Sequence, residues 1–223
     1  MLDNKIWVVI PAWNEEKNIG RVLGELKKFT SNILVVDDGS RDRTKEICRE
    51  QNVICISHRI NRGQGASLET GQEAALRLGA EIIVHFDSDG QMKPEEIEKV
   101  VAPIFLGEAD ITLGSRFLDD KTKIPWTKRY FILIPAKIFN WVFTGIWLTD
   151  AHCGFRALSR QAAEAISLKQ DAFAHATEIL EQIYEHKLRY KEIPVEISYY
   201  RYGLGFKMGI KIIKDLILRR LLS

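Results

Sequence analysis

Short apolar runs rich in β-branched residues alternate with longer segments of helical periodicity through the first half of this sequence. The runs span residues 6–10, 33–36, 53–56, 82–86 and 111–113, and the helical segments span residues 16–29, 44–51, 66–78 and 94–105. Strands that alternate with helices predict an α/β fold with a doubly wound, mostly parallel sheet and helices on both faces.

The alternation ends near residue 120, and the rest of the chain has a mixed pattern. We expect an apolar helix over residues 131–148, a strand near 155–158, a helix over about 177–187 and a strand near 190–197. A basic, amphipathic helix closes the chain. A length of 223 residues suits a single domain, which we divide into parts at 1–120, 121–205 and 206–223.

The charge balance and the cysteines exclude several classes of protein. Lys and Arg number 32 against 30 Asp and Glu, and the resulting net charge of +2 argues against a general nucleic-acid-binding protein. Three cysteines without C-x-x-C spacing argue against a disulfide framework or a zinc site, and they fit a reducing cytosol. The first apolar run is too short for a signal peptide, and no membrane-spanning helix is expected.

Polar residues follow each apolar run, at the strand ends where ligands of doubly wound sheets bind. In PAWNEE, after the first run, Asn14 can cap the next helix, and Glu15 can accept hydrogen bonds from a ligand or lie in the first helical turn. In VVDDGS, after the second run, two adjacent carboxylates suit a base ring and ribose hydroxyls. The alternative there is a turn capped by serine.

The fourth run ends in HFDSDGQ, which is a candidate metal site. Asp87 and Asp89 lie at the mouth of a buried strand, where both can reach one divalent cation, and Gln91 can add an oxygen or hold a metal-bound water. Hard oxygen ligands favour Mg²⁺ or Mn²⁺, which keep waters and bind a substrate diphosphate. The alternative is an acidic turn without a metal.

Glycines and arginines follow the third and fifth runs. Gly63 and Gly65 permit close approach of the backbone to a ligand, but the third glycine of a dinucleotide fingerprint is missing, and a flexible loop is the alternative. Arg116 can form a bidentate contact with a phosphate or carboxylate, or a surface salt bridge. Ligand-capable groups thus follow all five runs, which indicates a site for a nucleoside diphosphate and a metal at one edge of the sheet.

These motifs, in this order, resemble family 2 glycosyltransferases of the GT-A fold, and in particular the dolichyl- or polyprenyl-phosphate mannosyl- and glucosyltransferases. PAWNEE, VVDDGS, NRGQGAS, DSDGQ and GSR are similar to family motifs, and TDAHCGFRALSR is similar to the family signature D-x-x-x-G-F-R. Arg201 and Lys207 match an arginine and a lysine spaced by six, although Phe206 stands where the family has serine. The resemblance implies a metal-dependent, inverting transfer of sugar from a donor of the GDP-mannose or UDP-glucose type to a polyprenyl phosphate.

The resemblance also implies roles for individual residues. The residues expected to bind the nucleotide sugar are Pro11, Trp13, Glu15, Val36, Asp38, Asp87, Asp89, Arg116, Arg201 and Lys207. The residues expected to bind Mg²⁺ or Mn²⁺ are Asp87, Asp89 and Gln91, and those expected to act in catalysis are Asp89, Asp150, Arg116 and Arg201. Residues 1–120 would then form the nucleotide-sugar-binding half, 121–205 the acceptor-side half and 206–223 an amphipathic tail.

The choice of acceptor depends on whether a general base is present. A sugar hydroxyl needs a base, whereas a lipid phosphate is already anionic and needs cations such as Arg116, Arg156, Arg201 and Lys207. The chain also lacks the Q-x-x-R-W motif of similar polysaccharide synthases. Both points favour polyprenyl phosphate. The alternative is a hydroxyl of a glycan or small molecule, with Asp150 as the base; otherwise Asp150 orients Arg156 or caps a turn.

Two segments favour peripheral attachment to the cytoplasmic face of a membrane, where a polyprenyl phosphate resides. The expected helix over residues 131–148 is apolar almost all round, and Trp141 and Trp147 suit the headgroup region. Residues 205–223 carry five basic side chains against one acidic side chain, beside an apolar face. The alternatives are packing on the sheet, a homodimer contact or a membrane-protein partner.

Overall fold

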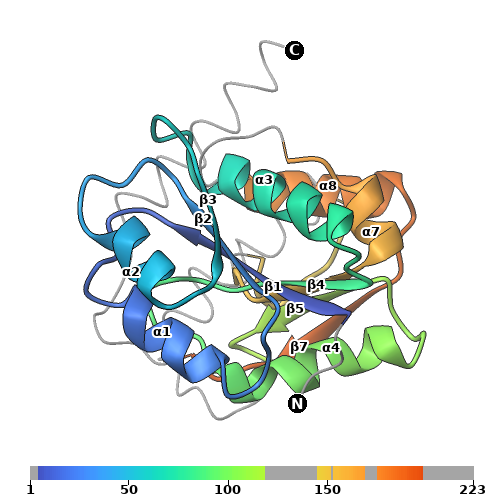
Figure 1. Cartoon of the computed structure of the whole chain (residues 1–223). Helices are drawn as coiled ribbons and strands as arrows, with labels where there is room; N and C mark the ends of the chain where they lie inside the picture. The colour runs from blue at the N-terminus through green and yellow to red at the C-terminus, as the bar shows by residue number, and fades with distance from the viewer. Residues whose placement is uncertain (1–4, 119–144, 152, 169–174, 198–223) are drawn as a thin grey trace, which may run out of the picture.

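A computed structural model describes residues 5–118, 145–151, 153–168 and 175–197, and these form a mixed α/β fold (Figure 1). Its centre is a seven-stranded sheet with helices on both faces. The strands are β1 (Ile6–Ala12), β2 (Ile33–Asp37), β3 (Ile54–Ser57), β4 (Ile82–His85), β5 (Ile111–Ser115), β6 (Arg156–Ser159) and β7 (Tyr190–Pro194). The helices are α1 (Ile19–Leu26), α2 (Thr44–Glu50), α3 (Gln64–Arg77), η1 (Pro94–Glu96), α4 (Ile97–Phe105), α7 (Arg160–Ala165) and α8 (His175–Glu185).

The strand order β3-β2-β1-β4-β6-β5-β7 combines parallel and antiparallel pairs. The first four strands pair in parallel, as do β5 and β7, whereas β6 runs antiparallel to both β4 and β5. Because β6 is antiparallel to both β4 and β5, these two strands run in the same direction. The carboxyl ends of β1, β2, β4 and β5 therefore lie along one edge of the sheet. The predicted mostly parallel sheet is confirmed, and the reversed strand β6 adds to it.

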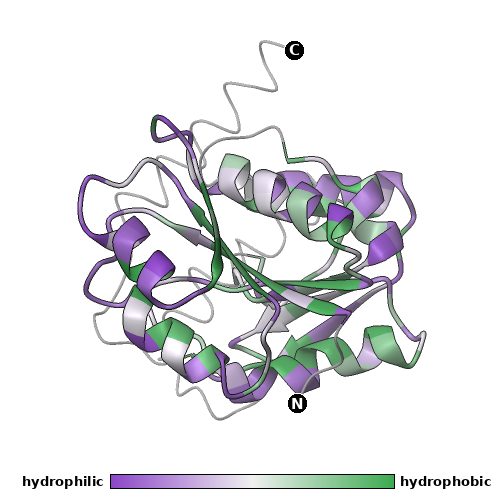
Figure 2. Cartoon of the chain, in the orientation of Figure 1, coloured by the Kyte–Doolittle hydropathy of each residue, from purple (hydrophilic) through white to green (hydrophobic). Residues whose placement is uncertain are grey.

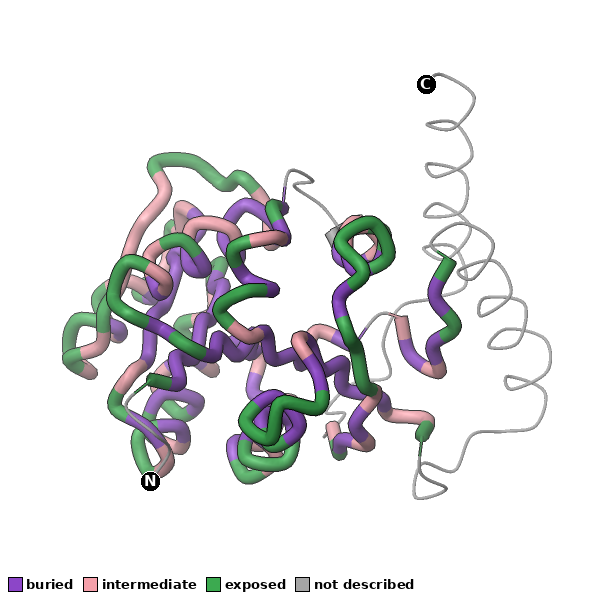
Figure 3. Tube along the Cα trace, turned by 90° about the vertical axis from the view of Figure 1, so that its right-hand side faces the viewer, coloured by how far each residue is buried: buried purple, intermediate pink, exposed green. Residues whose placement is uncertain are grey.

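Alternate residues of the central strands build two hydrophobic clusters, one on each face of the sheet. In β1, Val8 and Ile10 pack with α1, α2 and α4, whereas Trp7 and Val9 pack with α3, α7 and α8. Both faces are covered, and so the strands are apolar without alternation. Figure 2 shows largely hydrophobic strands between helices that carry hydrophilic residues, and Figure 3 shows buried residues through the middle of the molecule.

Helix α3 lies directly on the sheet at Gly71. A side chain at this position would meet the side chains of Val9 and Val36, so only glycine allows the helix to approach β1 and β2 this closely. The approach brings the first turn of α3, at Gln64, toward the carboxyl end of β4.

The predicted elements of the first half match the structure to within a few residues, but the role predicted for Asn14 differs. Helix α1 begins at Ile19, and Asn14 does not cap it: Asn14 has φ 55°, and its side-chain oxygen accepts from the Arg41 N–H at 2.9 Å. The predicted capping role is therefore wrong: the Asn14 side chain binds the loop after β2, and not the N-terminus of α1.

The second half differs more. Helix α7, which Ser159 caps by accepting from the Ala162 N–H, was not predicted. The expected helix over 131–148 is wrong for residues 145–148, which are not helical, while its other residues lie outside the described ranges. The expected tail helix, Arg201 and Lys207 also lie outside them. Among the described helices, none has the length and apolarity needed to cross a membrane.

Candidate active site

The loops that follow β1 and β2 are joined by hydrogen bonds between backbone and side chains. The hydroxyls of Ser40 and Thr44 accept from the N–H groups of Asn14 and Glu15, at 2.9 and 2.8 Å. Arg41 N–H completes the link by donating to the Asn14 side chain. Short polar side chains therefore fix the two loops against each other before any ligand is present.

Three of the residues predicted to bind the nucleoside lie at the ends of these two strands. Pro11 and Val36 are paired neighbours in the ladder of β1 and β2, and both are buried. The Val36 side chain packs beneath α3, so only its backbone can face a ligand. Trp13, just beyond β1, is 55% exposed and can stack on a ligand at this edge.

Glu15 is half-buried at the same edge, and its carboxylate accepts from the Asn18 side-chain amide at 2.7 Å. Burial raises the pKa of Glu15, the Asn18 hydrogen bond opposes the rise, and the negative charge of Asp89 adds to it. This coupling places Glu15 within electrostatic reach of the acidic loop after β4.

Asp38 is buried at 3% exposure, and it holds the loop that precedes α3. One carboxylate oxygen accepts from the Arg62 N–H at 2.9 Å and lies 2.7 Å from His58 Nδ1, while the other accepts from the Gly63 N–H at 2.7 Å. His58 Nε2 lies 3.0 Å from Thr70 Oγ1 on α3. Asp38 thus braces the glycine loop, and its contact with a nucleoside stays a prediction.

Asp87 follows β4 and is enclosed by other parts of the chain. Gln64 Nε2, at the start of α3, donates to Asp87 Oδ1 at 3.1 Å. A Cβ on Gly154 would lie 2.9 Å from Asp87 Oδ2, so a larger residue there would displace the carboxylate. Burial and the charge of Asp89 raise the pKa of Asp87 to about 6, and the charge of Arg156 opposes the rise.

Asp89 lies two residues further along the same turn. Its Oδ1 accepts from the Gln91 N–H at 2.9 Å. Burial raises the pKa of Asp89, while the Gln91 hydrogen bond and the charge of Arg21 oppose the rise. Gln91 therefore supports Asp89 through its backbone, and its side chain as a metal ligand stays a prediction.

The chemistry of Asp87 and Asp89 fits a hard divalent cation. Burial penalises both negative charges, and a bound cation would remove this penalty. Their oxygen atoms suit Mg²⁺ or Mn²⁺. No group of three or more His, Cys, Asp or Glu side chains in the described ranges can hold a metal. Within the described ranges, waters, a substrate diphosphate or a neutral oxygen such as that of Gln91 could supply further ligands.

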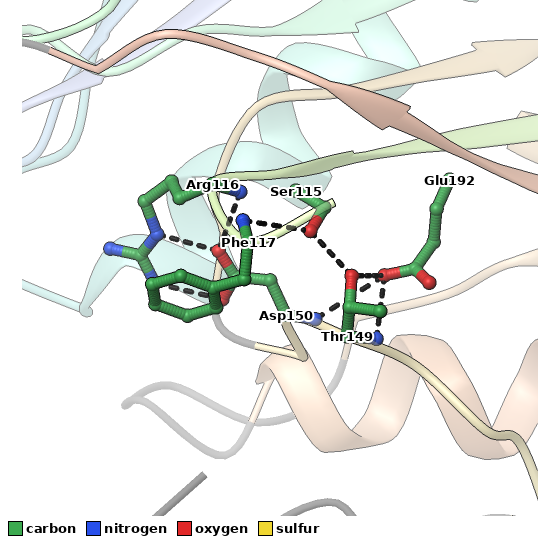
Figure 4. Close-up of polar contacts among 6 residues, drawn as sticks. All are labelled: Ser115, Arg116, Phe117, Thr149, Asp150 and Glu192. Carbon is green, nitrogen blue, oxygen red and sulfur yellow. Dashed lines mark hydrogen bonds and ion pairs between the residues drawn. The ribbon is translucent and has the colours of Figure 1, made fainter. Parts of the chain in front are cut away.

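Arg116, directly after β5, forms a bidentate ion pair with Asp150 (Figure 4). Arg116 Nε donates to Asp150 Oδ2 at 2.5 Å, and Nη2 donates to Oδ1 at 2.8 Å. The Arg116 N–H also donates to Asp150 Oδ2 at 3.2 Å. The Asp150 side chain is 3% exposed and that of Arg116 is 22% exposed. The predicted strand-end arginine is thus held by a buried carboxylate while part of it reaches the surface.

Another carboxylate lies beside this pair. Glu192, on β7, accepts hydrogen bonds from Thr149 and from the Asp150 N–H, and the Thr149 hydroxyl contacts that of Ser115 (Figure 4). These contacts join the ends of β5 and β7 to the segment that carries Asp150.

Arg156 begins β6 and is 2% exposed, between its ladder partners His85 and Leu113. Burial lowers its pKa, and the charges of neighbouring groups, including Asp87 and Asp150, oppose the decrease. Arg156 therefore lies beneath the site as an internal counter-charge, and not at its surface as we expected for a residue that meets the acceptor phosphate.

Three residues of the site were not singled out from the sequence. His58 and Gln64 lie in the HRINRGQGAS segment, which was noted for its glycines, and the polar residues around those glycines were the available signal. Glu192 lies in a predicted strand and carries no local signal, because its partners are more than 40 residues away in sequence.

The topology and the site define a class, the glycosyltransferases of the GT-A fold. The structure of glucosyl-3-phosphoglycerate synthase from Mycobacterium tuberculosis with Mn²⁺ and UDP-glucose is similar to this chain, with a TM-score of 0.72. The superposed region covers 96% of this chain and 78% of the synthase chain, and the sequence identity is 18%. At that identity the similarity supports the fold alone.

The chain belongs to glycosyltransferase family 2, since the sequence profile described as "Glycosyl transferase family 2" matches residues 7–167. It is 34% identical to the UDP-N-acetylglucosamine–dolichyl-phosphate N-acetylglucosaminyltransferase of Methanococcus voltae, over 99% of this chain and 98% of the relative. It is 32% identical to the polyprenol monophosphomannose synthase of Mycolicibacterium smegmatis, over 72% of this chain and 64% of the relative. The family resemblance of the motifs is confirmed, and the protein is a glycosyltransferase.

Proposed function

We propose that this enzyme transfers a sugar from a nucleoside diphosphate sugar to a polyprenyl phosphate, with inversion at the anomeric carbon and with Mg²⁺ or Mn²⁺ bound. The names of the two relatives support this acceptor class, because one is a dolichyl-phosphate transferase and the other a polyprenol monophosphomannose synthase. The donor is of the UDP-sugar or GDP-sugar type.

The observation that carries the choice of acceptor is the Arg116–Asp150 pair. A hydroxyl acceptor needs a base with an accessible oxygen. Both oxygens of Asp150 accept from Arg116, and the side chain is almost fully buried. Asp150 is therefore poorly suited to take a proton from an acceptor. A phosphate acceptor needs no base, since its oxygen is already negatively charged near neutral pH.

The other residues of the site suit the binding and departure of a diphosphate. A bound Mg²⁺ or Mn²⁺ would stabilise the negative charge of the leaving nucleoside diphosphate. Asp87 and Asp89 would hold that ion, and Gln64 fixes the orientation of Asp87. Arg116 brings positive charge to the same edge of the sheet from β5, in an orientation that Asp150 fixes before substrate arrives.

We further propose that the enzyme works at the cytoplasmic face of a membrane as a peripheral protein, because a polyprenyl phosphate does not readily leave the bilayer. Exposed apolar side chains support this proposal. Leu118 is 43% exposed, Trp147 is 52% exposed and Tyr184 is 64% exposed. The Tyr184 ring lies against Gly145, two residues from Trp147, and aromatic side chains such as these suit the headgroup region.

The proposal is tested by supplying the enzyme with Mn²⁺, a panel of UDP- and GDP-sugars, and either polyprenyl phosphate in anionic liposomes or soluble glycans. We expect a mild-acid-labile lipid phosphate sugar from one donor of the panel, and the loss of that product in EDTA. Transfer to a glycan with no lipid product would contradict the acceptor assignment and favour the hydroxyl alternative.

A further inference from the structure

The carboxylate of Glu192 gathers three hydrogen bonds on a single oxygen atom. Its Oε1 accepts from the Thr149 N–H at 2.8 Å, from the Thr149 hydroxyl at 2.7 Å and from the Asp150 N–H at 3.3 Å (Figure 4). Residues 149 and 150 belong to no helix or strand, so their N–H groups have no ladder partners. The Glu192 side chain accepts from these N–H groups in place of a neighbouring strand. Glu192 itself lies on β7, where it is paired with Leu113 of β5.

The hydroxyl contacts of this network have one consistent direction. The Thr149 hydroxyl has one proton, which it donates to Glu192, so at its 2.5 Å contact with Ser115 it has to accept. The Ser115 hydroxyl therefore donates to Thr149, and its oxygen accepts from the Phe117 N–H at 3.2 Å. The chain of donors runs from Phe117 through Ser115 and Thr149 and ends on the Glu192 carboxylate.

Arg116 lies between the two ends of this network. Its backbone neighbours, Ser115 and Phe117, are held by the hydroxyl chain, and its guanidinium is held by Asp150, whose N–H is held by Glu192. The Phe117 ring also lies against the guanidinium, with the Arg116 Cζ 5.3 Å from the ring centroid. Loss of the Glu192 carboxylate would loosen both the backbone and the ion pair that set the direction of Arg116.

We infer that Glu192 is a positioning residue for sugar transfer: through Thr149 it holds Asp150 and Ser115, and through them it orients Arg116 toward the diphosphate. This inference rests on the proposed function, in which Arg116 stabilises charge on the leaving group. Glu192 does not itself contact the substrate. A small displacement of a charge-stabilising group lowers the rate constant more than it lowers affinity for the donor.

The experiment compares two substitutions at Thr149 with one at Glu192, in the full chain with Mn²⁺, donor and acceptor. Thr149→Val removes the hydroxyl at nearly constant volume, whereas Thr149→Ser retains it. We expect Thr149→Val and Glu192→Met, which removes the acceptor oxygen at similar volume, to lower kcat about tenfold with less than a threefold change in the donor KM. Thr149→Ser should stay within about twofold of the parent.

Glu108→Met is the matched control, because Glu108 is a carboxylate that contacts β7 through Lys191, away from this network. We expect it to retain the parent kcat. An unchanged kcat in both Thr149→Val and Glu192→Met would overturn the inference. An equal loss in Thr149→Ser and Thr149→Val would also overturn it, since the hydroxyl would then not be what matters.

Hydrogen exchange separates failure of this inference from failure of the proposed function, because it needs no acceptor. Glu192→Met should speed exchange of the amides of Thr149, Asp150 and Phe117, with the amides of β1 and β2 unchanged. Unaltered exchange at all three amides would overturn the network. If the parent enzyme uses a different acceptor, the proposed function fails, and the kcat comparison is repeated with that acceptor.

Discussion

The two parts of the sheet hold their acidic groups in different ways. At the ends of β1, β2 and β4, the carboxylates of Asp87 and Asp89 are close together, and burial raises the pKa of both. At the ends of β5 and β7, the carboxylates of Asp150 and Glu192 are satisfied by Arg116, by backbone N–H groups and by the Thr149 hydroxyl.

The carboxylates after β4 therefore favour the binding of a positive charge, whereas Asp150 near β5 already has a positively charged partner in Arg116. Paired buried charges are neutral as a unit and hold a fixed geometry, whereas buried like charges favour binding of a cation. The region around β4 is thus suited to recruit a metal and its diphosphate. The region around β5 is suited to keep one arginine in place.

The largest effect is expected from neutralising the region around β4. Asp89→Asn should lower transfer at least about 1000-fold, because it neutralises one of the two carboxylates proposed to bind the metal. Steady-state turnover with Mn²⁺ measures this, and Glu95→Gln, at a nearby exposed carboxylate, serves as the control. Full activity of Asp89→Asn, or full activity of the parent in EDTA, would show that this part of the site does not work through a metal.

Separating the ion pair of the β5 region should have the next largest effect. Arg116→Ala and Asp150→Ala should each lower kcat about 100-fold, and the double variant should be little worse than either, because both changes disable the same unit. A double-mutant cycle on kcat measures the coupling. Additive losses would mean that Asp150 has its own chemical role, as the hydroxyl alternative requires.

A smaller effect is expected from the brace that supports the glycine loop. His58→Ala removes the side chain between Asp38 and Thr70, and should weaken donor binding about tenfold with kcat within about threefold of the parent. Calorimetric titration with the nucleoside diphosphate and Mn²⁺ measures the affinity. His186→Ala, at an exposed position after α8, is the control. A fall in kcat at unchanged affinity would place His58 in the chemical step.

The smallest effect concerns stability without metal. The pKa of Asp87 is about 6 in the folded protein against an ordinary value of 3.8, so its stabilising contribution is complete below about pH 4 and is lost as the pH rises through 6. Asp87→Asn should therefore gain in Tm over the parent by several degrees as the pH is raised from 4.5 to 7.5 in EDTA. Thermal unfolding measures the difference. A gap that does not change with pH would mean that Asp87 is not destabilised by burial.

The first half of the fold could be predicted because its signals are local. Each strand is a continuous apolar run, and each loop places its polar residues directly after the strand, so Asp87, Asp89 and Arg116 were found from their sequence positions alone. The direction of β6 could not be found in this way, since a strand of four residues has the same pattern in either direction.

The contacts within the site were less predictable than the residues themselves. Asp38 and Asp150 were both recognised, but their partners His58 and Arg116 lie 20 and 34 residues away. The acceptor that an N–H group binds depends on how distant loops pack together, and the sequence near that N–H group does not show this packing. The same holds for Asn14, whose side chain fitted a helix cap by sequence and binds the Arg41 N–H in the structure.

The placement of β6 between β4 and β5 has a consequence for how the chain is made. Strands β1 to β4 are consecutive in sequence and pair with one another, so they can assemble once residue 85 has left the ribosome. Strand β5 has no partner until residues 156–159 follow, and until then the edge of β4 stays open. Open strand edges invite pairing with other chains. The second half of the sheet is therefore the part of this enzyme that most needs protection during synthesis.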